Sequence, residues 1–187
     1  IGDLGGFAFE DYDSECENSF ANENGDRYIT CLNADLTLSD PEYIVATPRG
    51  NWTGKTKGGL ILSKDCGSTW ERLPMPRGLS EFIDQKLDNI EKPNVDSGWT
   101  AISADGKRIM WAVAGGRGFS NKAVCYTDYE GKTWQKSIFT DSSGNSADEH
   151  NVKIFSDYYN SDLFFAIAER ENLGFYISRD KGATFRE

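Results

Sequence analysis

The chain has 187 residues, which is enough for one domain with a well-buried core. Its 30 acidic and 20 basic residues give a formal net charge of −10 at pH 7. This charge repels polyanions, so we expect no nucleic-acid partner and no membrane partner. Neutral partners such as polysaccharides are compatible with it. The longest apolar run, residues 163–168, is too short to cross a bilayer. Because Ile1 stands where a natural start has Met, we expect a processed or excised chain.

Short apolar runs separated by turn residues predict a chain of strands. Aromatic residues make up 13% of the sequence, and 19 glycines accompany only 5 prolines, which suits many short strands joined by tight turns. Turns are expected at Asp40-Pro41, at Asp105-Gly106 and in the polar stretch 157–162. In chain order, the expected strands are residues 36–38, 43–47, 59–62, 99–103, 108–114, 123–126, 152–155, 163–168 and 175–178. Residues 79–92 have roughly helical spacing and are expected to form an insertion at the rim.

One eight-residue pattern occurs three times, at residues 63–70, 127–134 and 178–185. It runs hydroxyl, any, Asp, any, Gly, any, Thr, aromatic. The Asp can accept hydrogen bonds from the N–H groups of its own turn, and the Gly provides a positive φ at little cost. The second copy has Tyr129 at the Asp position, and Asp128 is the candidate substitute. The residues expected to hold these turns are Ser63, Asp65, Gly67, Trp70, Thr127, Gly131, Trp134, Ser178, Asp180, Gly182 and Phe185.

The repeated pattern resembles the Asp-box (BNR) turn of sialidase-like β-propellers, where it joins the third and fourth strands of a blade. The predicted fold is therefore an all-β propeller in which strand, turn, strand, loop, strand and box form one blade. Blades are expected at residues 36–75, 95–139 and 149–187, after a leading segment at 1–35, which makes three to four blades. The last blade is expected to lack its outer strand. Closed propellers have about four to eight blades, so we expect part of a larger, seven-bladed propeller.

The N-terminal segment carries the most specific pattern, with Gly2-Asp3, then Gly6-Phe7 and an acidic cluster that includes Asp11. It resembles the C-terminal propeller of glycoside hydrolase family 74, the xyloglucan-active endoglucanases and related reducing-end-specific cellobiohydrolases. The similarity continues at residues 40–45, 98–106 and 109–112. One departure is Phe9, which stands near a position where the family has a His.

The resemblance implies an inverting hydrolase of the β-1,4-glucan backbone of xyloglucan, secreted from the cell, with Asp3 as the general acid. The partner Asp belongs to the family's N-terminal propeller, which this chain does not contain. Inversion needs two carboxyl groups about 6.5–9.5 Å apart, so that one protonates the glycosidic oxygen while the other activates a water molecule. Apolar neighbours such as Leu4 and Phe7 would raise the pKa of Asp3 and keep it protonated.

The remaining aromatic and polar residues divide into binding candidates and packing residues. Trp52, in the loop 48–57, is the candidate platform for a sugar ring, and Asp11 is a second candidate substrate contact. Trp99 and Trp111 lie in or beside strands and are expected in the core. His150, the only histidine, is expected to be a loop residue.

The cysteines give no metal-site pattern. The spacings of Cys16, Cys31, Cys66 and Cys125 match no zinc motif, and no cofactor or metal is expected. Cys16 and Cys31 flank a polar loop and could form a disulfide. The alternative is that all four cysteines are free thiols.

Two other functions are compatible with the repeats. The first is a non-catalytic Asp-box propeller module that binds a glycan or a protein, since the turn is scaffold and carries no function. The second is a sialidase, which the sequence disfavours: such enzymes need an arginine cluster and a tyrosine nucleophile, and the arginines here are scattered in a strongly acidic chain.

Overall fold

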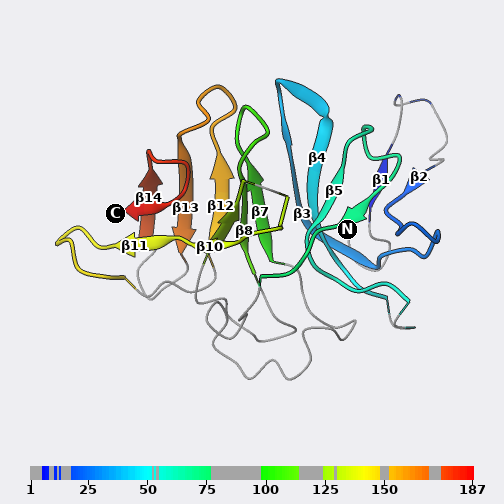
Figure 1. Ribbon diagram of the computed structural model, residues 1–187, viewed down its shortest axis with the longest axis horizontal. Coiled ribbons are helices and arrows are strands. Elements are labelled where there is room, and N and C mark those ends of the chain that lie inside the picture. Colours follow the sequence, from blue (N-terminus) through cyan, green and yellow to red (C-terminus); the bar gives the residue numbers. More distant parts are fainter. Residues whose placement is uncertain are drawn as a thin grey trace.

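Three β-sheets lie side by side in chain order, as the computed structural model shows (Figure 1), and their pairing is antiparallel apart from one parallel strand pair in the third. The described residues form strands and turns and include no helix. The predicted all-β fold is therefore confirmed. The structure describes residues 6–8, 11, 13, 18–51, 53, 55–76, 98–113, 124–128, 130–147, 152–168 and 174–187. The expected insertion at 79–92 lies outside them.

The first sheet has the strand order β3-β4-β5-β6. Its strands are β3 (Thr30–Thr37), β4 (Asp40–Arg49), β5 (Ile61–Ser63) and β6 (Glu71–Arg72). A two-stranded hairpin of β1 (Phe7–Ala8) and β2 (Asn18–Ser19) precedes it. The expected turn at Asp40-Pro41 is wrong by two residues, because Asp40 already pairs with Thr37. Pro41 follows in a register shift of the ladder, where its missing N–H removes no strand hydrogen bond.

The second sheet repeats this plan with the order β7-β8-β9-β10. Its strands are β7 (Trp99–Ile102), β8 (Ile109–Ala112), β9 (Val124–Thr127) and β10 (Gln135–Lys136). The predicted Asp105-Gly106 turn joins β7 to β8, with the Gly106 N–H donating to the Ser103 carbonyl at 2.8 Å and Gly106 at φ 71°. Each predicted strand of this sheet overlaps an observed one, with ends that differ by one or two residues.

The third sheet has five strands, which corrects one expectation. Strands β12 (Lys153–Ser156), β13 (Phe164–Ala168) and β14 (Gly174–Ser178) were predicted, but the sheet also contains β15 (Thr184–Arg186). The expectation that the outer strand is missing is therefore wrong, since the last two residues of the third repeat and Arg186 form β15, which pairs with β14. Strand β11 (Ile138–Thr140) then crosses from the second sheet and pairs parallel to β15.

The three sheets share a strand register, because the first residue of each repeat, which ends the strand before it, pairs with the equivalent residue of the neighbouring strand. Ile44 pairs with Ser63 in the first sheet, Ile109 with Thr127 in the second, and Phe164 with Ser178 in the third. Alternate residues point to opposite faces of a sheet. We call the face that looks back to the preceding sheet face A and the face that looks forward to the following sheet face B.

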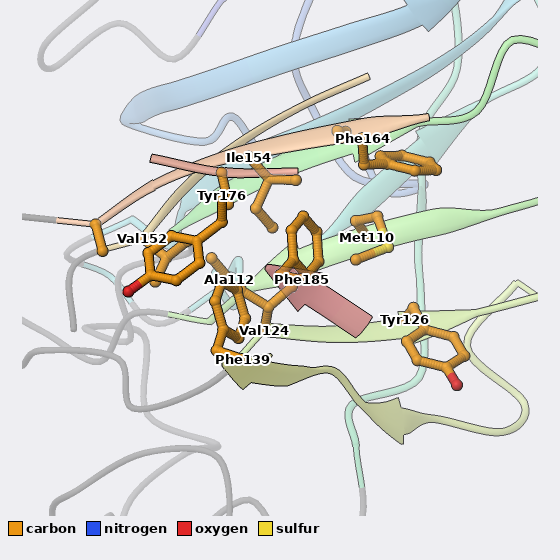
Figure 2. Close-up of a cluster of buried hydrophobic side chains, with 13 residues drawn as sticks. Met110, Ala112, Val124, Tyr126, Phe139, Val152, Ile154, Phe164, Tyr176 and Phe185 are labelled. Atoms are coloured by element: carbon orange, nitrogen blue, oxygen red, sulfur yellow. The ribbon is translucent and has the colours of Figure 1, made fainter. Parts of the chain in front are cut away.

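The core lies between the sheets. Face B of the first sheet and face A of the second bury one cluster, which contains Val45, Leu60, Leu62, Leu73, Ile102, Ile109, Trp111, Val113 and Cys125. Face B of the second sheet and face A of the third bury a larger cluster, shown in Figure 2. In that cluster Phe139 stacks on Phe185 with ring centroids 4.7 Å apart. Face A of the first sheet is covered by Phe20 and Tyr28 of the N-terminal segment.

Candidate functional site

The topology gives the sheets two different ends. The β3–β4, β7–β8 and β12–β13 hairpins and the three repeats lie at one end, which we call the turn end. The C-terminal ends of β4, β8 and β13 and the N-terminal ends of β3, β7 and β12 lie at the other, which we call the loop end. Contacts between hairpins and repeats agree with this arrangement, since the Cys66 N–H donates to the Glu42 carbonyl at 3.2 Å and the Lys181 N–H to the Asp162 carbonyl at 3.0 Å.

The first and third repeats form the same hydrogen-bonded turn. In the first, Asp65 Oδ1 accepts from the Thr69 N–H at 2.8 Å and Oδ2 from the Thr69 hydroxyl at 2.6 Å. Ser63 Oγ donates to Asp65 Oδ1 at 2.7 Å and accepts from the Gly67 N–H at 2.8 Å. The third repeat has the same four bonds, at 2.6–2.9 Å, among Ser178, Asp180, Gly182 and Thr184.

These bonds make the two repeat aspartates structural acceptors. Partial burial acts to raise the pKa of Asp65, but the hydrogen bonds from Thr69 and Ser63 outweigh it and hold this pKa below its ordinary value. The balance at Asp180 is the same, with the bonds coming from Thr184 and Ser178. A carboxyl group with a lowered pKa is ionised at neutral pH and does not act as a general acid there.

The repeat glycines also allow close contact between sheets. Gly182 has φ 78°, and a Cβ built on it would lie 2.3 Å from Met110 Sδ of the second sheet. Gly131 has φ 81°, and a Cβ there would lie 2.9 Å from the carbonyl oxygen of Pro74, just after β6 of the first sheet. Both positions therefore need glycine for backbone conformation and for packing. The repeat aromatics pack differently: Trp70 and Phe185 are buried, whereas Trp134 is half-buried and donates from Nε1 to the Pro74 carbonyl at 2.9 Å.

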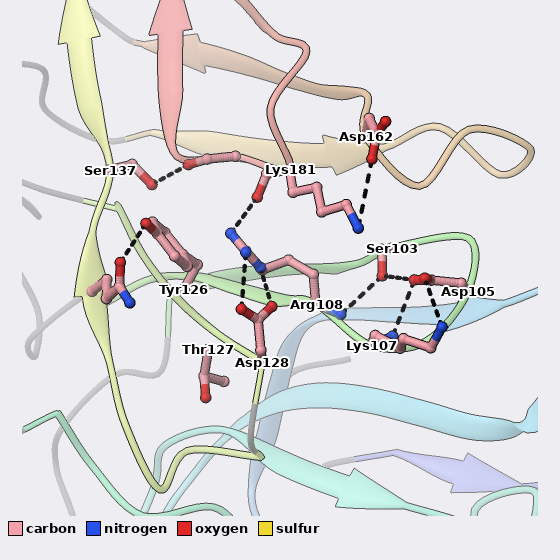
Figure 3. Close-up of polar contacts among 12 residues, drawn as sticks. Ser103, Asp105, Lys107, Arg108, Tyr126, Thr127, Asp128, Ser137, Asp162 and Lys181 are labelled. Atoms are coloured by element: carbon pink, nitrogen blue, oxygen red, sulfur yellow. Dashed lines mark hydrogen bonds and ion pairs between the residues drawn. The ribbon is translucent and has the colours of Figure 1, made fainter.

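Asp128 does not substitute for the missing Asp of the second repeat; it pairs with Arg108 (Figure 3). The Arg108 guanidinium donates to both oxygens of Asp128, with 3.0 Å between Nη2 and Oδ2. Its Nη1 donates to the Lys181 carbonyl at 2.7 Å, and the group lies 4.1 Å from the centroid of the Tyr126 ring. The expectation for Asp128 is therefore wrong: its carboxylate instead helps to join the second sheet to the third repeat.

The residues that carried the catalytic prediction belong to the N-terminal segment and to a loop at the loop end. Asp3 and Trp52 lie outside the described residues, so their roles stay predictions. Asp11 is exposed, and its Oδ1 accepts the Asp13 N–H at 2.8 Å. Its predicted contact with substrate also stays a prediction.

Hydrogen bonds of Asn51 and Thr56 hold the described part of the loop that contains Trp52. Asn51 Oδ1 accepts from the Thr53 hydroxyl at 2.6 Å and from the Lys55 N–H at 3.1 Å. The Thr56 hydroxyl accepts the Asn51 N–H at 2.7 Å and donates to the Arg27 carbonyl at 3.3 Å. The described part of this loop is thus fixed to the N-terminal segment at residues 22–27.

A second aromatic group lies at the loop end and was assigned to the core by sequence reasoning. Trp99, the first residue of β7, is only half-buried, and its ring meets that of Phe155 edge-on at 6.1 Å. Lys153 Nζ lies 5.6 Å from the Trp99 ring centroid. The indole N–H is buried and has no hydrogen-bond partner among the described residues. Trp111, in contrast, is fully buried as expected.

A carboxylate in the middle of β3 joins all three sheets, and sequence reasoning missed it. Asp35 Oδ2 accepts from the Ile102 N–H of β7 and from the Ser156 hydroxyl of β12, each at 2.9 Å. Asn33, two residues earlier, accepts the Thr100 N–H at 2.8 Å. Strand β7 is the inner edge of its sheet, so these side chains satisfy N–H groups that no neighbouring strand can reach. Burial raises the pKa of Asp35 above its ordinary value despite its hydrogen bonds.

Other candidate sites are few in the described part of the chain. No group of three or more metal-ligating side chains occurs among the described residues. The Cys31 thiol donates to the Asn33 carbonyl at 3.3 Å, and Cys16 lies outside the described residues, so the question of their disulfide stays open. A groove of about 710 Å³ lies between the N-terminal segment and the first repeat, where Asn22, Arg27 and Glu71 contribute to its lining. Within the described ranges, no helix is long and apolar enough to span a membrane.

Comparison with known proteins identifies the fold. No protein-family model and no curated protein matches the chain. A glycoside hydrolase family 74 (GH74) enzyme from Niastella koreensis matches over 98% of this chain and 21% of its own, with 17% identity and a TM-score of 0.66. The GH74 xyloglucanase of Xanthomonas campestris matches over 99% of this chain and 22% of its own, with 20% identity and a TM-score of 0.68.

The chain has the propeller-blade fold of the GH74 enzymes. The sheets described above are therefore propeller blades. The chain spans about a fifth of the length of these two enzyme chains.

Proposed function

We propose that this chain is part of a glycoside hydrolase that cleaves the β-1,4-glucan backbone of xyloglucan. The observation that carries the proposal is the blade fold shared over nearly the whole chain with GH74 enzymes, one of them a xyloglucanase. The acidic surface is compatible with a neutral polysaccharide and unfavourable for polyanions. A polysaccharide is too large to enter a cell intact, which supports a secreted protein.

In the proposed mechanism Asp3 is the general acid. It protonates the glycosidic oxygen as the bond to the anomeric carbon breaks, while a carboxylate of a second propeller, the N-terminal one of the proposed enzyme, removes a proton from the attacking water. Because water attacks from the face opposite the leaving group, the new reducing end has the inverted, α configuration. The half-buried Trp99 and the loop of Trp52 both belong to the loop end, where aromatic faces could stack on sugar rings. The carboxylates of Asp65 and Asp180, which are ionised and fixed in turns, do not compete for the role of the acid.

Product analysis tests this proposal. The 187-residue chain, alone and together with the second propeller, is incubated with xyloglucan and with a mixed-linkage glucan as control. We expect oligosaccharides only from xyloglucan, only when the second propeller is present, and with the α configuration in the first NMR spectra. Substitution of Asp3 by Asn is expected to lower turnover by about 10²–10⁴-fold. The matched control is Asp40→Asn, which changes an exposed carboxylate at the turn end and should leave turnover unchanged.

The alternative, a non-catalytic glycan-binding module, makes a different prediction. Affinity for xyloglucan oligosaccharides without cleavage, even after the second propeller is supplied, would replace the hydrolase proposal by this one. Cleavage by the 187-residue chain alone would show that the second carboxylate is within this chain.

A further inference from the structure

The hairpin that joins β12 to β13 presents two neighbouring tyrosines to solvent at the turn end (Figure 1). Tyr158 exposes 50% of its surface and Tyr159 exposes 90%. Burial of apolar surface is what a side chain contributes to the core, and a ring as exposed as that of Tyr159 contributes almost none. The fold therefore does not account for this ring.

The other two sheets show that this hairpin does not need aromatic residues. The corresponding turns, residues 38–39 between β3 and β4 and residues 103–108 between β7 and β8, contain none. Turns favour Gly, Asn, Asp and Ser, because these residues fit the backbone and bond to it. Two successive tyrosines in such a turn are typical of binding, since exposed loops carry function and tyrosine is enriched at contact surfaces.

Hydrogen bonds fix the backbone that carries the two rings. Asp157 Oδ1 accepts the N–H groups of Tyr159 and Asn160, each at 2.9 Å. Asn160 Oδ1 accepts the Asp162 N–H at 3.0 Å, and the Asp162 carbonyl accepts the Lys181 N–H of the third repeat at 3.0 Å. A ligand that binds to this hairpin therefore orders little backbone, which lowers the entropy cost of binding.

We propose that Tyr158 and Tyr159 form a second binding site for a neutral β-1,4-glucan chain, at the end opposite to the loop end. In such a chain the hydroxyls of each glucose unit are equatorial, so both ring faces present C–H groups that a tyrosine ring can cover while its own hydroxyl stays in water. Asp157 Oδ2 and the Asn160 side-chain N–H groups have no hydrogen-bond partner among the described residues, and they can bind sugar hydroxyls.

The charge of the chain favours a neutral glycan over an anionic one. The choice of glucan rests on the substrate class of the proposed function, and the site itself is an addition to it. A site away from the point of cleavage would hold the protein on the polymer and raise the local concentration of backbone bonds.

Affinity electrophoresis tests this inference. The 187-residue chain migrates through native gels that contain increasing concentrations of xyloglucan, or of dextran, an α-linked glucan, as control. The retardation gives the dissociation constant. The variants are the double substitution Tyr158→Ala with Tyr159→Ala, and Tyr159→Phe, which keeps the ring. The matched control is Leu38→Ala, because Leu38 is 48% exposed at the tip of the β3–β4 hairpin and has no ring to stack. Urea unfolding confirms that each variant is folded.

We expect xyloglucan, and not dextran, to retard the unmodified chain. The double variant should raise the dissociation constant roughly tenfold, the loss typical of truncating aromatic anchors, whereas Tyr159→Phe and Leu38→Ala should leave it unchanged. Equal retardation of the double variant and the unmodified chain would overturn the inference. No retardation of the unmodified chain by xyloglucan would also overturn it and would leave the tyrosines to a protein partner.

The result is separable from the test of hydrolysis, because no cleavage is measured. If the hydrolase proposal fails, product analysis yields no oligosaccharides while retardation by xyloglucan persists. If only the second site fails, oligosaccharides appear while the double variant and the unmodified chain are retarded equally.

Discussion

Replacement of Asp35 by Ala should destabilise the protein, because this carboxylate holds the inner strands of all three sheets together. The substitution leaves the Ile102 N–H buried without an acceptor, since Ile102 is 1% exposed and lies on the inner edge strand β7. An orphaned buried donor costs about 1–3 kcal/mol, and the lost bond from the Ser156 hydroxyl adds about 1 kcal/mol. Removal of the carboxylate also removes the cost of burying its charge, which offsets part of this loss. We therefore expect the free energy of unfolding to fall by about 2–3 kcal/mol.

Urea unfolding at pH 7 measures this loss. With an m-value of about 2 kcal/mol/M, the unfolding midpoint of Asp35→Ala should lie roughly 1 M below that of the unmodified chain. The matched control is Asp141→Ala, because Asp141 Oδ1 also accepts two backbone N–H groups, at 2.8 and 2.9 Å, but does so at the surface. Water can replace that acceptor, so the control should unfold close to the unmodified chain. Equal midpoints for Asp35→Ala and the unmodified chain would refute the proposed role of Asp35.

The pH dependence of Asp35→Asn provides a second test of the same residue. Burial raises the pKa of Asp35, so the folded state holds this proton more tightly than the unfolded state. Its contribution to stability is therefore greatest below the unfolded pKa of about 3.9 and decreases as the pH rises through the folded pKa. Asp35→Asn lacks this decrease. The difference in unfolding free energy between the unmodified chain and Asp35→Asn should therefore change between pH about 3.9 and the folded pKa of Asp35, and should be constant at higher pH.

Three further outcomes follow from the contacts between sheets and within the repeats. Gly182→Ala should lower the free energy of unfolding in urea by about 2–4 kcal/mol, because of its positive φ and a clash with the second sheet. The control Gly144→Ala, at φ 83° with no atom within 4 Å of the added Cβ, should lower it by only about 1 kcal/mol. Arg108→Met should cost about 1–3 kcal/mol, because the third repeat loses a buried donor, whereas Lys107→Met, on an exposed neighbour, should cost about 0–1 kcal/mol in the same assay. Asp180 has a lowered pKa, so its contribution is present above the unfolded pKa of about 3.9 and lost as the pH falls through the folded pKa; Asp180→Asn should therefore flatten the acid limb of stability against pH. A destabilisation of Gly144→Ala equal to that of Gly182→Ala, a Lys107→Met effect as large as that of Arg108→Met, or an unchanged acid limb would contradict the respective argument.

The fold was predictable because its signals are local. Each repeat places Asp, Gly, Thr and an aromatic residue at fixed offsets, and the Asp65 and Asp180 turns close within eight residues. The strands that lead into the repeats are short apolar runs, and those too can be recognised from neighbouring residues alone.

The missed features all depend on residues far apart in the chain. Asp35 is 121 residues from Ser156, and Arg108 is 73 residues from the Lys181 carbonyl that it binds. No periodicity shows that an Asp inside a strand accepts N–H groups of the next sheet, or that Asp128 turns towards Arg108. Strand β11 likewise forms only because β15 is present as its parallel partner. The predicted catalytic residue Asp3 came from a resemblance, and its role stays a prediction.

Leaving-group dependence tests the central claim, that Asp3 donates the proton in glucan hydrolysis. The assay compares turnover of xyloglucan with turnover of an aryl glycoside of a xyloglucan oligosaccharide, by the unmodified protein and by Asp3→Asn, with the second propeller present. A phenolate with a low pKa leaves without a proton, so only xyloglucan turnover requires the acid. We predict that Asp3→Asn lowers turnover of xyloglucan by about 10²–10⁴-fold and leaves that of the aryl glycoside nearly unchanged. Equal losses on both substrates, or no loss on either, would contradict the account.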